Sequence, residues 1–171
     1  MFVDIAQIPA EGLDVQFRGT EDFLDPSGER VHLLRPVEAA LHFCRNPTGV
    51  LVRGQISSDL QLHCSRCFEL FTLQVREGFE VQYRGPLGAA EVGEEHELGH
   101  EELDVDFLDG SRISVEGLVR ENVLLTLPVQ ALCHDECRGL CPQCGINLNR
   151  ETCPCSSTAI DPRWRSLESL R

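Results

Sequence analysis

The sequence contains no lysine: all 15 of its basic residues are arginine, against 28 aspartates and glutamates. The formal net charge is −13 at pH 7, and the arginines are scattered along the chain. Unaided long-range attraction to nucleic acid is therefore disfavoured, because nucleic-acid-binding proteins carry clustered basic residues. We attribute the absence of lysine to compositional bias of the genome. The alternative is recognition of phosphate or carboxylate groups by guanidinium forks.

Anchoring segments and catalytic motifs are missing as well. Every apolar run falls short of the roughly 20 residues that a membrane helix needs, and residues 1–10 have neither the basic start nor the apolar core of a secretory signal. We therefore expect a cytoplasmic protein without a membrane partner. The chain also lacks a Gly-x-Ser-x-Gly motif and a Walker-type phosphate loop. We therefore predict that the protein is not an enzyme and has no small-molecule substrate.

Cysteine, by contrast, is abundant, and its spacing points to metal. In Cys141-Pro-Gln-Cys144-Gly145 two thiolates can reach one ion, and the glycine permits the positive φ that such a tight turn often needs. The odd total of nine cysteines and the missing signal disfavour a secreted disulfide scaffold. Eight of the nine fall into two groups. The candidate metal ligands are Cys64, Cys67, Cys133, Cys137, Cys141, Cys144, Cys153 and Cys155.

Four thiolates in a closed tetrahedron are a common donor set for structural zinc, so we predict one or two Zn²⁺ ions. An iron–sulfur cluster would use the same ligands, but the C-terminal spacing matches no ferredoxin pattern. A redox pair at Cys64 and Cys67 would need a thiol of lowered pKa. The residues that follow alternate like a strand, so no helix N-terminus is expected there to lower it.

The partition of the cysteines stays open. Two four-thiolate sites would each carry a formal charge of −2, which nearby arginines at 66, 138 and 150 could offset. A single C-terminal site would instead contain Cys141 and Cys144 with a ligand from position 153 or 155 and another from 133 or 137. Cys64 and Cys67 would then be a free pair. The ninth cysteine, Cys44, is expected to be a small buried hydrophobe in a strand.

Apolar alternation predicts an α+β fold in which an antiparallel sheet of five or six strands packs against one main helix. Gly54 is expected to mark a bulge. Ser114 is a suitable N-cap for the main helix, and Pro128 ends it. A short terminal helix is predicted from Asp161-Pro162 onward. The predicted strands cover residues 1–5, 13–17, 37–45, 50–63, 68–75 and 79–83.

These elements suggest two parts. Residues 1–130 form a sheet core with an acidic loop at 85–109 and the helix at 114–127. Residues 131–171 form a cysteine-rich, zinc-stapled segment that ends in the short helix. The acidic loop holds nine carboxylates and no arginine, which is typical of a solvated loop and less often of a docking segment.

The order of the motifs resembles the YceD family of large ribosomal RNA subunit accumulation proteins. The resemblance rests on Cys64-Ser-Arg-Cys67-Phe68, on Cys137-Arg-Gly-Leu-Cys-Pro-Gln-Cys-Gly145 and, more weakly, on Asp161-Pro162-Arg163-Trp164. It extends over nearly the whole chain. It implies a bacterial or organellar protein needed for the accumulation or processing of 23S rRNA, and it implies no established enzymatic activity.

Three functional hypotheses follow. The first is a non-enzymatic factor in large-subunit biogenesis that binds a ribosomal protein, because the acidic field favours a basic client. The second is direct binding of 23S rRNA through residues 131–171, which are neutral overall. The third is a cysteine-based redox or metal-dependent regulatory protein. In the first hypothesis the carboxylates that shield the client are those of Glu91, Glu94, Glu95, Glu97, Glu101 and Glu102.

Overall fold

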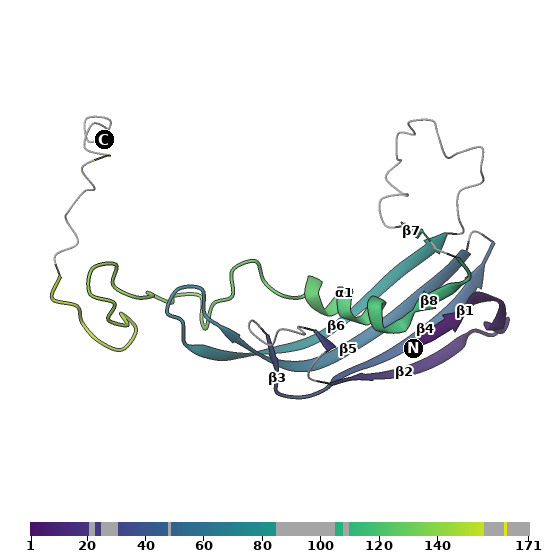
Figure 1. Ribbon diagram of the computed structural model, residues 1–171, viewed down its shortest axis with the longest axis horizontal. Coiled ribbons are helices and arrows are strands. Elements are labelled where there is room, and N and C mark those ends of the chain that lie inside the picture. Colours follow the sequence, from purple (N-terminus) through teal and green to yellow (C-terminus); the bar gives the residue numbers. More distant parts are fainter. Residues whose placement is uncertain are drawn as a thin grey trace.

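The protein forms a long twisted sheet with a helix on one face, in the computed structural model shown in Figure 1. Among the described residues the sheet has six strands, in the order β2-β4-β5-β6-β7, with β3 beside β5. The predicted α+β class, an antiparallel sheet with one main helix, is confirmed. The described residues are 1–20, 23–24, 31–47, 49–84, 105–107, 110–155 and 163.

Four antiparallel strands make up most of the sheet: β2 (Leu13–Gly19), β4 (Val37–Asn46), β5 (Gly49–His63) and β6 (Leu70–Arg84). The short β3 (His32–Leu33) pairs with β5 beyond the end of β4. At the other edge β7 (Val105–Phe107) runs parallel to β6. A separate two-stranded ladder joins β1 (Phe2–Asp4) to β8 (Arg112–Ser114), and the 3₁₀ turn η1 (Ile5–Gln7) follows β1.

The hairpin of β5 and β6 is the longest feature of the fold. Each strand has 15 residues, which corresponds to a length of about 50 Å. The register runs without interruption from Gly49 opposite Arg84 to His63 opposite Leu70. The bulge expected at Gly54 is therefore wrong. A Cβ at this position would lie 2.3 Å from the ring of Phe79, so the glycine makes room for a cross-strand aromatic side chain.

The main helix, α1 (Val115–Leu125), covers one face of the sheet (Figure 1). Ser114 caps it, because its side-chain oxygen accepts a hydrogen bond from the Gly117 amide at 3.1 Å. The helix ends three residues before Pro128, close to the predicted limits. Its buried side chains pack with alternate residues of β4 and β5 into one hydrophobic core. The buried helix residues are Val115, Leu118, Val119 and Val123.

Two expectations need correction. Residues 105–107 lie in the predicted acidic loop but form β7, where the β-favouring Val105 and Phe107 alternate with an aspartate. Cys44 is only half-buried, because strand alternation places it on the face opposite the buried Phe43. The remainder of 85–109 and the predicted terminal helix lie outside the described residues, apart from Arg163. No helix in the described part of the chain is long and apolar enough to span a bilayer.

Candidate metal centres

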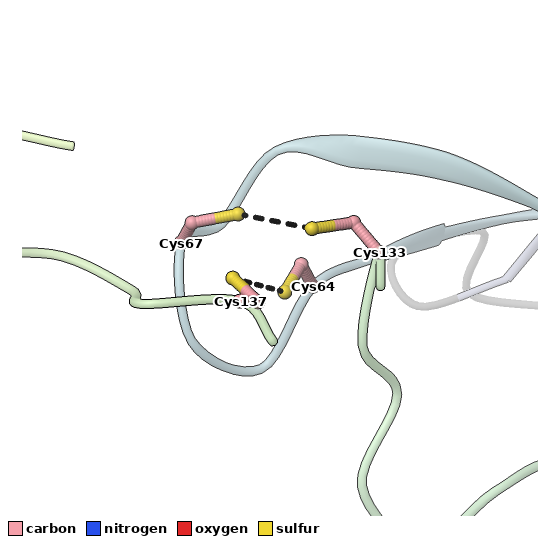
Figure 2. A group of neighbouring side chains, drawn as sticks. All are labelled: Cys64, Cys67, Cys133 and Cys137. Carbon is pink, nitrogen blue, oxygen red and sulfur yellow. Dashed lines mark hydrogen bonds between the residues drawn. The ribbon is translucent and has the colours of Figure 1, made fainter. Parts of the chain in front are cut away.

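A cysteine knuckle closes the hairpin of β5 and β6. The amide of Cys64 donates to the carbonyl of Glu69 at 2.9 Å, and the amide of Phe68 donates back to the carbonyl of Cys64 at 3.0 Å. Phe68 consequently adopts a left-handed conformation with φ of 61°. This short turn brings the thiol groups of Cys64 and Cys67 into one group, with Cys64 directed toward Cys137 and Cys67 toward Cys133 (Figure 2).

The C-terminal segment contains a second copy of the same turn. The amide of Cys141 donates to the carbonyl of Ile146 at 2.8 Å, and the amide of Gly145 donates to the carbonyl of Cys141 at 2.9 Å. Gly145 has a φ of 75°, matching the conformation of Phe68. The positive φ predicted after the second cysteine of this motif is confirmed. The two turns share their hydrogen-bond pattern although one ends a long hairpin and the other a short one.

The first knuckle meets two cysteines from the segment after α1. Cys64 Sγ lies 3.7 Å from Cys137 Sγ, and Cys67 Sγ lies 3.7 Å from Cys133 Sγ (Figure 2). All four sulfurs lie within 4.8 Å of one another, and we call this group the bridging tetrad. Three of the four cysteines are buried. They form a second small core, and the apolar side chains packed against it are Phe71, Leu132 and Leu140.

Several hydrogen bonds fasten the C-terminal segment to the first knuckle. The amide of Ser65 donates to the carbonyl of Ala131 at 2.7 Å, and the side chain of Arg66 donates to the carbonyl of Cys137 at 2.9 Å. Arg150 forms a 2.6 Å ion pair with Glu69, just before β6. The bridging tetrad therefore lies in a continuous interface between parts of the chain that are distant in sequence.

The second knuckle contributes to a separate group of four. Cys153 Sγ lies 3.4 Å from Cys144 Sγ and 3.3 Å from Cys141 Sγ, and Cys155 completes the set within 4.8 Å. We call this group the terminal tetrad. Cys144 is exposed and Cys153 and Cys155 are half-buried. All four ligands come from one short stretch, so this centre does not join distant parts of the chain.

Both tetrads fit a tetrahedral zinc ion. A zinc–sulfur bond of about 2.3 Å implies sulfur–sulfur separations of about 3.8 Å. The bridging tetrad already shows two separations of 3.7 Å, and the terminal tetrad is somewhat tighter. Four protein thiols close each set, which is the arrangement of a structural zinc site. A bound ion would supply crosslinking between the segments that carry its ligands.

One cysteine in each tetrad has a lowered thiol pKa, which favours its thiolate form. Burial opposes ionisation of Cys64, but the amide groups of Cys67, Arg66 and Cys133 outweigh it and lower the thiol pKa to about 6. Hydrogen bonds from the amides of Cys144 and Gln143 similarly lower the pKa of Cys141 to about 6. Both are the first cysteine of a knuckle, so the turn itself stabilises the first anionic ligand.

Other sulfurs hold their protons more tightly. Burial, followed by the neighbouring thiol groups, raises the pKa of Cys133 to about 12. For Cys153 the Cys155 amide favours ionisation, but the thiol groups of Cys141 and Cys144 outweigh it and raise the pKa to about 12. A divalent cation that binds to either tetrad must therefore displace protons from sulfur.

Polar groups around the bridging tetrad orient its ligands. The side-chain amide of Asn149 donates to Cys137 Sγ at 3.3 Å, while its oxygen accepts from the Arg138 amide at 2.8 Å. His134 Nδ1 lies 3.1 Å from Cys133 Sγ. His63 Nδ1 instead donates to the carbonyl of Phe68 at 3.0 Å. The two histidines are thus neighbours of the cysteine groups.

All eight candidate cysteines are brought together, and they divide four and four. The geometry matches the two-site alternative and differs from the single-site one, in which Cys133 or Cys137 would join Cys141 and Cys144. It also pairs Cys64 and Cys67 with partners across the boundary drawn at residue 130. Sequence reasoning assigned no role to Asn149 or Phe68, although Phe68 belongs to a motif that carries the family resemblance. A signal for Phe68 did exist, because it follows the second cysteine just as Gly145 does.

A shallow hollow on the outer face of the sheet is the other candidate site. It has a volume of about 720 Å³, where Ala40 and Gly78 leave little side-chain bulk. The charged groups at its rim are paired: Arg53 with Glu80 at 2.6 Å, and His42 Nδ1 with an Asp14 oxygen at 2.7 Å. Because these charged groups already pair with one another, the hollow offers fewer free polar groups to a ligand than the tetrads do.

Comparisons with known proteins agree on one family. The family model described as "Large ribosomal RNA subunit accumulation protein YceD" matches residues 52–171. The uncharacterised proteins Rv2926c of Mycobacterium tuberculosis and Mb2951c of Mycobacterium bovis are each 34% identical over 123 residues, which cover 71% of this chain and 56% of theirs.

A plant protein is similar over a longer stretch. The "Large ribosomal RNA subunit accumulation protein YCED homolog 1, chloroplastic" of Arabidopsis thaliana is 24% identical over 156 residues, covering 80% of this chain and 49% of that protein. The chain thus spans about half the length of these relatives. No solved structure matches significantly. The matched region contains both tetrads, most of β5 and all of β6 and β7, and the chain belongs to the YceD family.

Proposed function

We propose that this chain is a non-enzymatic factor in large-ribosomal-subunit biogenesis that supports the accumulation or processing of 23S rRNA in the bacterial cytoplasm. The observation that carries the proposal is the family match over residues 52–171. The family description names the accumulation of large ribosomal RNA, and so does the name of the Arabidopsis relative.

The mode of action we propose is binding. Zinc in the bridging tetrad would hold segment 131–155 against the hairpin, and zinc in the terminal tetrad would order the end of that segment, which would give the protein a fixed surface there. In this proposal the chain has two parts, a core of residues 1–130 and a zinc segment of residues 131–171. The bridging tetrad connects the two parts. The net charge of −13 favours a basic ribosomal protein as client over naked rRNA.

Depletion of the protein in the source organism tests the biological role. We expect the ratio of 23S to 16S rRNA to fall, and expression of the wild-type chain should restore it. Complementation by a Cys137→Ser variant should fail if the bridging tetrad is needed. An unchanged ratio after depletion would overturn the proposal.

Binding measurements test the mode of action. We expect the zinc-loaded chain to bind at least one individually purified large-subunit ribosomal protein more tightly than it binds 23S rRNA fragments. Replacing the six glutamates at 91, 94, 95, 97, 101 and 102 by glutamine should weaken that binding, since the carboxylates would shield a basic client. Tighter binding to rRNA would favour the direct rRNA alternative.

A cysteine-based redox or metal-dependent regulatory role is the second candidate. The exposure of Cys144 and the lowered pKa of Cys141 favour it at the terminal tetrad. Alkylation of the zinc-loaded protein by a thiol reagent tests this role. Modification of Cys141 or Cys144 within minutes would support it, and protection over hours would argue against it.

A further inference from the structure

The two knuckles differ at one position that their shared geometry makes comparable. The residue after the second cysteine has φ of 75° in one knuckle and 61° in the other. Glycine occupies it as Gly145, but phenylalanine occupies it as Phe68. Phe68 is also the one non-glycine residue with positive φ among the described residues. A left-handed conformation is unfavourable for a residue with a bulky side chain, whereas glycine adopts it freely.

Burial of the Phe68 side chain does not offset the unfavourable free energy of this backbone conformation. Its side chain is 68% exposed, although its neighbours Cys64 and Cys67 are buried. The apolar groups packed on the bridging tetrad come from Phe71, Leu132 and Leu140 instead. Leu70, two residues further along, is 50% exposed. The closed end of the hairpin therefore presents two large apolar side chains that the fold itself does not use.

The position of this pair suits it for contact with another molecule. The hairpin extends past the end of α1, so that its closed end lies away from the helix-covered part of the sheet (Figure 1). The bridging tetrad and its hydrogen bonds hold the turn in place. An exposed aromatic side chain on a fixed turn has few torsions to restrict on binding, and aromatic residues are enriched at interface hot spots.

We propose that Phe68, assisted by Leu70, is the anchor through which this protein binds an apolar pocket on a basic client protein. This inference rests on the proposed function and specifies the surface it uses. Charge favours a protein client, because a chain with a net charge of −13 repels a nucleic acid and attracts a cationic protein. The charged neighbours of the pair, Glu69 and Arg150, neutralise each other at 2.6 Å.

The decisive variant is Phe68→Gly, because it removes the ring and gives the turn the residue of its sister knuckle. We expect its dissociation constant for the bound large-subunit ribosomal protein to rise at least tenfold. Its Tm should stay equal or rise by a few degrees, and its zinc content should remain at the wild-type value. Phe68→Ala should weaken binding to a similar extent, and Leu70→Ala should weaken it less.

Val129→Ala is the matched control, since Val129 is fully exposed and lies in the linker after α1. Its affinity for the ribosomal protein should match that of the wild type. The measurements are calorimetric titration with individually purified large-subunit ribosomal proteins, thermal unfolding and elemental analysis. The same variants are titrated with single-stranded 23S rRNA fragments.

Each other outcome overturns the inference in a distinguishable way. If the wild type binds no ribosomal protein, the binding mode of the proposed function fails together with the inference. Unchanged affinity of Phe68→Gly, with the wild type binding, would remove the inference alone. Loss of rRNA binding only would identify Phe68 as a base-stacking residue instead. A lower Tm or lost zinc would show that the ring has a structural role.

Discussion

The two tetrads use the same knuckle for different purposes. The bridging tetrad pairs cysteines that are 66 and 73 residues apart, and its core is buried. The terminal tetrad pairs cysteines that are 9 and 12 residues apart, and one of its ligands is exposed. In both tetrads the turn determines how two thiols would face one ion. The positions of the other two cysteines determine whether a bound ion would crosslink distant segments of the fold or only order a loop.

The largest predicted effect comes from breaking one tetrad at a time. Cys137→Ser should lower the free energy of unfolding by about 3 to 5 kcal/mol, because it opens a long crosslinked loop and loses a metal site. Cys153→Ser should lower it by about 1 kcal/mol or less, because its loop is short and separate from the core. Urea unfolding in the presence of zinc measures both. Equal losses would mean that the terminal tetrad also supports the core.

Acidification should affect the two tetrads alike. The lowered pKa of Cys64 and Cys141 means that their thiolates stabilise the fold above the ordinary thiol pKa, and that this contribution is lost as the pH falls through about 6. Each tetrad also has two cysteines with raised pKa. Zinc affinity should therefore fall at least about a hundredfold per pH unit between pH 8 and 6.

Competition with a chromophoric chelator at several pH values measures this slope. The variants Cys137→Ser and Cys153→Ser isolate one tetrad each. If zinc affinity depends on pH to the same extent at both tetrads, this would support the view that the knuckle turn controls ionisation of its first cysteine. A clearly shallower slope at one tetrad would break the likeness between them.

A smaller effect should separate the tetrads through Asn149. Its side chain donates to Cys137 Sγ at 3.3 Å, so Asn149→Ala should weaken zinc binding at the bridging tetrad by about tenfold. The terminal tetrad should keep its wild-type affinity and serves as the internal control. Chelator competition measures the bridging site in the Cys153→Ser background and the terminal site in the Cys137→Ser background. Equal weakening at both sites would point to a general loosening of the segment.

The smallest effect is expected at Gly145. A Cβ there would contact no described atom within 4 Å, so Gly145→Ala tests the backbone conformation alone. Because φ is 75°, the substitution should cost about 1 kcal/mol at the terminal knuckle, or about fivefold in zinc affinity. Zinc titration of the Cys137→Ser background measures it. No change would show that the knuckle tolerates a side chain, and would weaken the comparison with Phe68.

Much of the sheet could be predicted because its signals are local. Alternation from Val37 to Phe43 gives β4, and Ser114 and Pro128 bracket α1 within three residues. The bulge at Gly54 was wrong because the reason for that glycine lies across the sheet in Phe79. Local patterns carry no information on a partner that is 25 residues away.

The eight cysteines were predictable as candidate ligands, but their partition was not. Spacing identifies Cys64 with Cys67 and Cys141 with Cys144, since two thiols in one turn face one ion. Whether Cys133 lies near the first pair or the second depends on where the segment that follows α1 lies relative to the hairpin. That position follows from the packing of the helix on the sheet, which the sequence pattern does not specify.

The bridging tetrad could hold two fragments of the chain together after cleavage of the backbone. Cleavage anywhere between residues 84 and 105 would leave an N-terminal fragment with Cys64 and Cys67 and a C-terminal fragment with Cys133 and Cys137. The fragments would still share the pairings of β1 with β8 and of β6 with β7, and one metal ion would be ligated by both. Two separately produced halves should therefore reassemble when zinc is added, and a chelator should release them again.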